Sequence, residues 1–124
     1  MPALNHLIIP AKDKDASAKF LANVLGVEVG QPWGPFRPVR TSNGVTLDFV
    51  TSQDVRTQHY AFLVDDKEFD SGLAKLQKAG VAYWANHDKT GPNEVNRNWG
   101  GRGFYFEDPN GHWMELITKP YGDL

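Results

Sequence analysis

The spacing of apolar residues along the chain predicts two helices, one in each half. The first is expected over 13–25 and the second over 65–79, each ending at a glycine, Gly26 and Gly80. Each helix carries an apolar stripe on one face. The stripe consists of Phe20, Leu21, Val24 and Leu25 in the first helix and of Phe69, Leu73 and Leu76 in the second.

Short apolar or alternating runs predict strands on either side of these helices. They are expected at 5–10, 27–31, 39–41 and 45–51 in the first half, and at 59–64, 81–84, 103–107 and 113–118 in the second. Asn43-Gly44 favours a hairpin, and residues 108–111 favour a turn. The order is β-α-β-β-β twice, which predicts an α+β fold in one domain, 1–124, with modules at about 4–53 and 58–118.

The two closing hairpins are similar in sequence, which indicates an internal repeat. Residues 43–51 (NGVTLDFVT) align without a gap with residues 110–118 (NGHWMELIT), with Asn, Gly and the final Thr identical. His6 and His59 both open the first strand of a module and are 53 positions apart, whereas the two hairpins are offset by 67 positions. The second module therefore contains an insertion, expected in the polar stretch 85–101.

Composition excludes several classes of protein. A chain of 124 residues and 13.9 kDa fits one domain, and its net charge of −2 disfavours a nucleic acid or an anionic membrane as partner. With no cysteine there is no disulfide and no thiolate metal ligand. The chain has no signal-like or membrane-spanning segment, so a cytoplasmic protein is expected.

The repeat places one histidine and one carboxylate in each module, His6 with Asp48 and His59 with Glu115. Nitrogen and oxygen ligands of this kind suit Zn²⁺, Fe²⁺, Mn²⁺, Ni²⁺ or Co²⁺. Taken singly, a strand histidine more often bonds to a carbonyl than to a metal. Glu115 has an alternative too, an ion pair with Arg102 or Arg97. Four such residues at equivalent positions favour the metal site.

The chain resembles a known superfamily in its paired modules, in a histidine on the first strand of each, and in the closing segment 106–117 (FEDPNGHWMELI). It resembles the vicinal oxygen chelate superfamily, which includes glyoxalase I, fosfomycin-resistance proteins, extradiol dioxygenases, methylmalonyl-CoA epimerase and bleomycin-resistance proteins. The resemblance extends over about residues 4–118. It implies a cupped mixed β-sheet with the helices outside and a homodimer.

By this resemblance, His6, His59 and Glu115 match the positions that bind a divalent metal. Asp48 matches a fourth position, which glyoxalase I fills with the longer Glu. That difference leaves three roles open for Asp48: a catalytic base, a partner of a metal ligand, or a charged wall of the pocket.

The resemblance implies a metal-dependent enzyme with isomerase/lyase or dioxygenase chemistry on a small substrate that chelates the metal through adjacent oxygens. The metal would act as a Lewis acid, and Glu115 or Asp48 would move the proton. The alternative is a metal-free protein of the bleomycin-resistance type that binds and sequesters a small molecule. The polar stretch 85–101 is expected near the pocket mouth and favours a polar or anionic substrate.

Overall fold

The computed structural model describes residues 1–122. The chain forms two compact units, Met1–Arg56 and Thr57–Leu124, and the boundary between them falls between the two predicted modules. Over the described residues, no helix is both long and apolar enough to cross a membrane.

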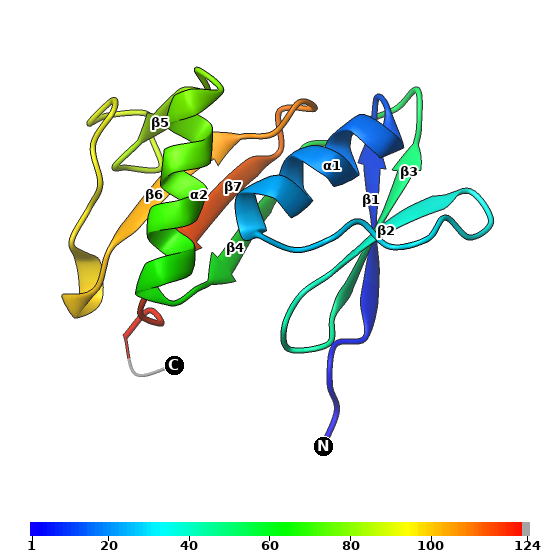
Figure 1. Cartoon of the computed structure of the whole chain (residues 1–124), viewed down its shortest axis with the longest axis horizontal. Helices are drawn as coiled ribbons and strands as arrows, with labels where there is room; N and C mark the ends of the chain where they lie inside the picture. Colours follow the sequence, from blue (N-terminus) through cyan, green and yellow to red (C-terminus); the bar gives the residue numbers. More distant parts are fainter. Residues whose placement is uncertain (123–124) are drawn as a thin grey trace. The chain divides into compact units, whose positions relative to one another are not determined.

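The first unit is a three-stranded sheet with one helix (Figure 1). Its elements are β1 (His6–Ala11), α1 (Lys14–Leu25), β2 (Phe36–Arg40) and β3 (Thr46–Thr51). The strand order is β1-β3-β2, with β1 parallel and β2 antiparallel to the central β3. The hairpin expected at Asn43-Gly44 joins β2 to β3, and Gly44 there has a positive φ of 83°.

Helix α1 begins and ends as the sequence predicts. The Asp13 side chain accepts hydrogen bonds from the backbone N–H groups of Asp15 and Ala16, and Gly26 ends the helix with a φ of 72°. Its buried face differs from the predicted stripe, because Phe20 is partly exposed. Small side chains allow close packing instead, and the buried residues are Ser17, Ala18, Leu21, Ala22, Val24 and Leu25.

The strand predicted at 27–31 is wrong. Only Val29 pairs there, as a single bridge to Val39, and the Gly30 N–H donates to the Pro38 carbonyl at 2.8 Å. Pro38 has no N–H with which to continue the ladder. The pairing therefore stops after one bridge, and the first unit has one strand fewer than the second.

The second unit is a four-stranded sheet with one long helix. Its elements are β4 (His59–Leu63), α2 (Asp66–Lys78), β5 (Tyr83–Trp84), the 3₁₀ turn η1 (Asn98–Gly100), β6 (Gly103–Glu107) and β7 (Trp113–Ile117). The strand order is β4-β7-β6-β5, with β4 parallel to β7 and the other pairs antiparallel. Helix α2 crosses one face of this sheet (Figure 1).

The core of the second unit lies between α2 and the sheet. The Phe69 and Phe104 rings meet edge to face, 5.0 Å apart. The fully buried apolar side chains of this core are Phe69, Leu76, Phe104, Phe106, Met114 and Leu116. The predicted helical residue Leu73 is partly exposed, while Gly72 is buried. Because side chains alternate along a strand, the odd-numbered residues of β6 and β7 face away from this core.

The strand registers confirm the internal repeat. In the first unit, His6 lies opposite Thr46 and Ile8 opposite Asp48. In the second unit, His59 lies opposite Trp113 and Ala61 opposite Glu115. Each histidine therefore shares a sheet face with its carboxylate, one strand across and two residues along. Both units are mixed sheets with a helix, so the predicted α+β class is confirmed.

Candidate metal centre

The sheet face of the second unit that points away from α2 carries the candidate site. Residues of β4, β6, β7 and β5 contribute to it, because strand alternation directs their side chains to the same side. The polar and aromatic side chains of this face are His59, Glu115, Tyr105, Trp113, Trp84 and Glu107. The residues between them along each strand point to the other face and belong to the apolar core. The sheet therefore has one apolar face against α2 and one polar face.

His59 and Glu115 are in direct contact. The His59 Nε2 atom lies 3.0 Å from Glu115 Oε1, and the His59 Nδ1 atom lies 2.9 Å from the carbonyl oxygen of Trp113. The Glu115 carboxylate is buried, with 1% of its surface exposed, whereas the His59 side chain is 47% exposed. A carboxylate this deep needs a compensating positive charge or strong donors.

This geometry requires a positive species between the two side chains. The Trp113 carbonyl can only accept, so His59 donates its Nδ1 proton to it. Without a proton on Nε2, the ring would present the lone pair of that nitrogen to Glu115. Two lone pairs facing each other need either a proton or a metal ion between them. Metal-binding histidines commonly fix their orientation through such a carbonyl contact.

The separation also fits a shared metal. Two ligands bound at about 2.1 Å and at right angles to each other lie about 3.0 Å apart. The His59 Nε2 to Glu115 Oε1 distance of 3.0 Å matches that arrangement. His59 and Glu115 therefore fit two adjacent positions in the coordination shell of a divalent cation such as Fe²⁺, Mn²⁺, Zn²⁺, Ni²⁺ or Co²⁺.

Two phenols surround the second oxygen of Glu115. The Tyr121 hydroxyl donates a hydrogen bond to Glu115 Oε2, and it lies 3.1 Å from the Tyr105 hydroxyl. Burial and the hydrogen bond to Glu115 raise the pKa of Tyr121 well above its ordinary value. Burial also raises the pKa of Tyr105, with a further contribution from the Glu115 charge. Both phenols therefore stay protonated at neutral pH.

Aromatic rings extend this face from His59 toward β5. The rings of His59 and Tyr105 are 6.0 Å apart, those of Tyr105 and Trp113 are 5.7 Å apart, and those of Trp113 and Trp84 are 5.5 Å apart. Lys89, from the polar stretch 85–101, lies over the rings of Trp84 and Trp113. The insertion thus reaches the candidate face, as its length and polarity predicted.

In the first unit, the equivalent residues His6 and Asp48 have other hydrogen-bond partners. Asp48 is buried at 2% exposure, and its Oδ1 accepts a hydrogen bond from Trp33 Nε1 at 3.3 Å. His6 is exposed, and its Nδ1 lies 2.7 Å from the side-chain oxygen of the adjacent Asn5. The structure therefore brings together His59 and Glu115 but shows no contact between His6 and Asp48. Within either unit, the described residues do not gather three His, Asp or Glu side chains into a metal-binding group.

The structure also decides between the alternative partners of Glu115. Arg102 does not pair with it, since its guanidinium lies 2.7 Å from Asp70 and 3.0 Å from Asp66, both on α2. Sequence reasoning missed Tyr121 and Tyr105 as neighbours of Glu115. Tyr105 could have been found, because the alternation of β6 places it on the face of its register partner Glu115. For Tyr121, which follows the last strand, the sequence contains no comparable signal.

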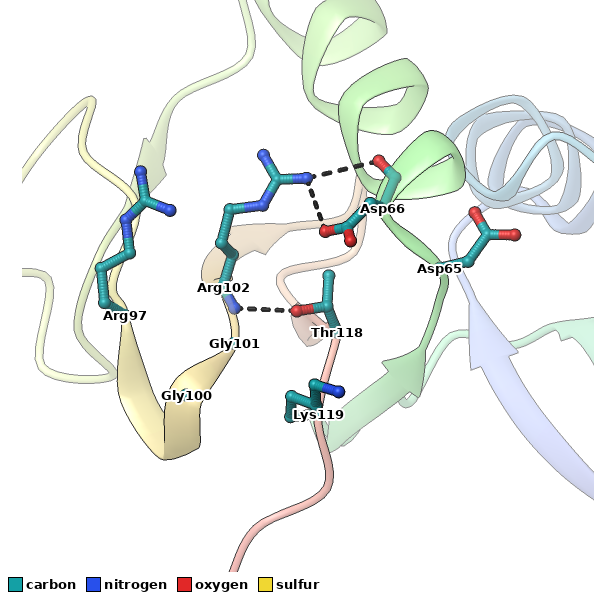
Figure 2. A pocket seen from close by; sticks show the side chains of 8 residues that line it. All are labelled: Asp65, Asp66, Arg97, Gly100, Gly101, Arg102, Thr118 and Lys119. Atoms are coloured by element: carbon teal, nitrogen blue, oxygen red, sulfur yellow. Dashed lines mark hydrogen bonds and ion pairs between the residues drawn. The ribbon is translucent and has the colours of Figure 1, made fainter.

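A surface pocket of about 550 Å³ lies elsewhere in the second unit (Figure 2). It is lined by Asp65, Asp66, Arg97, Gly100, Gly101, Arg102, Thr118 and Lys119, at the start of α2. Arg102 there contacts the ring of Phe69, on the α2 side of the sheet. The pocket contains none of the residues around His59 and Glu115, and Arg102 and Asp66 form an ion pair within it.

Comparison with known proteins identifies the family. The model of the glyoxalase/bleomycin resistance protein/dioxygenase superfamily matches residues 3–116, nearly the whole chain. The chain belongs to this superfamily. The resemblance that the closing segment indicated is therefore confirmed, together with the fold class that it implied.

Individual relatives narrow the class of function. The chain is similar to the glutathione transferase FosA of Serratia marcescens, with 29% identity over 123 residues, 94% of this chain and 80% of the relative. It is more similar to two solved oxidases. The oxidase ChaP-H2 is 52% identical, with a TM-score of 0.95 over 98% of this chain and 96% of its own. The oxidase ChaP-H1 is 48% identical, also with a TM-score of 0.95. The match covers 98% of this chain and 99% of ChaP-H1.

These similarities support one of the two predicted function classes. All three relatives are named for an enzymatic activity, and none is named as a binding or sequestration protein. The comparisons therefore support the predicted class of a superfamily enzyme, and the metal-free binding protein is not favoured.

Proposed function

We propose that this chain is a divalent-metal-dependent oxidase that acts on a small substrate with adjacent oxygen atoms. The observation that carries the proposal is the contact between His59 Nε2 and Glu115 Oε1, at 3.0 Å, with the opposite histidine nitrogen held by a carbonyl. Identity near one half to two oxidases, over almost the full length of each chain, favours oxidation over the isomerase/lyase reaction.

The proposed ligands are His59 and Glu115, with His6 as a third. His6 occupies the position in the first module that His59 occupies in the second, as the strand registers show. A bound divalent cation would supply Lewis-acid chemistry to the substrate oxygens and a path for electrons toward the oxidant. The cation could be Fe, Mn, Zn, Ni or Co, and a redox-active one suits an oxidase best.

The chain's own residues would perform the remaining steps. The Trp113 carbonyl holds the His59 ring, and Tyr121 holds the far oxygen of Glu115. We propose that Asp48 accepts a proton from the substrate. A buried carboxylate on the sheet face that its module shares with His6 is suited to that task, since the Trp33 N–H keeps it oriented. Glu115 is the alternative acceptor.

The aromatic side chains on the candidate face indicate the kind of substrate. Trp84, Trp113 and Tyr105 offer flat apolar surfaces beside the proposed metal, and the Lys89 ammonium lies within 5.7 Å of both tryptophan rings. A substrate with a planar part and negatively charged oxygens would match both features. This agrees with the polar or anionic substrate that the insertion favoured.

Oxygen uptake by metal-loaded protein tests the proposed reaction. We expect consumption of O₂ with at least one compound from a panel of catechols, hydroquinones and α-hydroxyketones, and none with apo-protein or with Glu115→Gln. Glu28→Gln is the matched control, because Glu28 is an exposed glutamate outside the candidate face. Turnover of an α-hydroxyketone without O₂ uptake would favour the isomerase/lyase reaction instead.

A second proposal concerns assembly, since the superfamily resemblance implies a homodimer. Large apolar side chains are exposed near the edges of both sheets, with Leu4 at 66%, Ile8 at 56% and Leu63 at 60%. We propose that a second copy of the chain covers these side chains. Light scattering should give about twice the chain mass of 13.9 kDa, and the mass of a single chain at all concentrations would contradict this proposal.

A further inference from the structure

The chain after β7 turns back toward Glu115, and contacts with the residue before β6 fix its path. The Thr118 hydroxyl accepts a hydrogen bond from the Arg102 N–H at 2.8 Å (Figure 2). The Thr118 N–H donates to the Arg102 carbonyl at 3.0 Å. Gly101 makes this approach possible. A Cβ at that position would lie 2.6 Å from Lys119 Cγ and 2.7 Å from Thr118 Oγ1.

This path places the Tyr121 side chain beside Glu115, the candidate metal ligand. Its ring packs near the Trp99 ring, with centroids 6.1 Å apart, and its hydroxyl bonds both to Glu115 Oε2 and to the Tyr105 hydroxyl. The two oxygens of Glu115 therefore have different partners. Oε1 faces His59, and Oε2 is bonded to Tyr121.

We propose that Tyr121 is a positioning residue for the metal ligand Glu115, an inference that rests on the proposed function. By occupying Oε2, the Tyr121 hydroxyl directs Oε1 toward His59, where that oxygen would be available to a bound cation. Glu115 is only 1% exposed, so water cannot easily replace this hydrogen bond. The C-terminal segment thus contributes to the metal centre without supplying a ligand.

Cobalt titration of Tyr121→Phe tests this role. The Phe variant keeps the ring against Trp99 but removes the donor to Oε2. Loss of a hydrogen bond to a metal ligand commonly weakens metal binding by about 10- to 100-fold, and we expect a rise in the Co²⁺ dissociation constant of that size. The visible absorption of bound Co²⁺ should also change, because the freed oxygen can join the coordination shell. A loss of packing alone would leave that spectrum unchanged.

Tyr83→Phe is the matched control. It makes the same chemical change in the same unit, but the Tyr83 hydroxyl accepts a hydrogen bond from Gln77, at 3.0 Å, and does not contact Glu115. We expect wild-type Co²⁺ affinity in Tyr83→Phe. Equal affinities and spectra for wild type, Tyr121→Phe and Tyr83→Phe would overturn the role of Tyr121 while leaving the metal site intact.

Gly101→Ala provides a second test that changes no side chain near the metal. The added methyl group would displace Thr118 and Lys119, and Tyr121 with them. We expect weaker Co²⁺ binding, in the same direction as Tyr121→Phe. Normal affinity in a folded Gly101→Ala protein would contradict the inference. Failure of the wild-type protein to bind Co²⁺ would overturn both the inference and the proposed function.

Discussion

The two modules share a backbone arrangement but hold their histidine and carboxylate in different ways. In each, the histidine opens the first strand, and the carboxylate lies one strand across and two residues along. In the second module the longer Glu115 reaches His59 at 3.0 Å. In the first, the shorter Asp48 bonds to Trp33 instead, and His6 bonds to Asn5.

The difference shows that strand register places candidate ligands on one face but does not decide what they bind. Glu115 is one methylene group longer than Asp48, and a different side chain covers each carboxylate. These two differences determine which groups each carboxylate contacts. Tyr121 covers the carboxylate of the second module and Trp33 that of the first, and each donates a hydrogen bond. We therefore propose metal binding for the pair His59 and Glu115, and proton transfer for Asp48.

Asp48→Asn should have the largest effect if the two carboxylates have these separate tasks. The amide keeps an oxygen that can accept from Trp33 but cannot take up a proton from the substrate. Loss of a general base commonly lowers kcat by about 10²- to 10⁴-fold, and we expect a fall of that order with unchanged metal content. Steady-state kinetics together with metal analysis measure both quantities.

Asp54→Asn, at an exposed position, is the control for this substitution. If Asp48→Asn lost its metal along with its activity, Asp48 would be a ligand rather than a base, and the contrast between the modules would be wrong.

Glu115→Asp would give the second module the carboxylate of the first. The shorter side chain should no longer reach the position beside His59 Nε2. We expect metal affinity to fall by at least about 10- to 100-fold, because that is the usual cost of losing only a supporting contact to a ligand. Co²⁺ titration provides the measurement, and Glu107→Asp on the same sheet face is the control. Unchanged affinity would show that carboxylate length does not distinguish the modules.

Trp33→Phe tests the covering residue of the first module. It removes the donor to Asp48 and leaves a buried carboxylate oxygen without that partner. We expect a loss of about 1–3 kcal/mol in the free energy of unfolding, measured by urea denaturation. Trp99 has a similar exposed fraction, 60% against 56%, so Trp99→Phe is a suitable control. Equal effects of the two substitutions would mean that the hydrogen bond to Asp48 contributes nothing.

The sequence predicted most of the fold because its signals were local and repeated. Helix caps, glycine stops and the Asn43-Gly44 hairpin are set by nearby residues. The aligned hairpins matched Glu115 with Asp48, and the first strands of the two modules matched His59 with His6. The strand at 27–31 was wrong because its pairing partner contains Pro38, which cannot continue the ladder. Tyr121 was missed for a similar reason. Its place depends on how Gly101 and Thr118 fold the chain back, which no periodicity in the sequence records.

Metal content is the most direct test of the central claim, that His59 and Glu115 hold a divalent cation. The measurement is elemental analysis by mass spectrometry of tag-free wild type, His59→Ala and the exposed control His87→Ala, after reconstitution and removal of free metal. We predict about one equivalent of metal per chain in wild type and His87→Ala, and almost none in His59→Ala. Equal and negligible metal in all three proteins would contradict the claim. The 3.0 Å contact would then be a proton-mediated pair between His59 and Glu115.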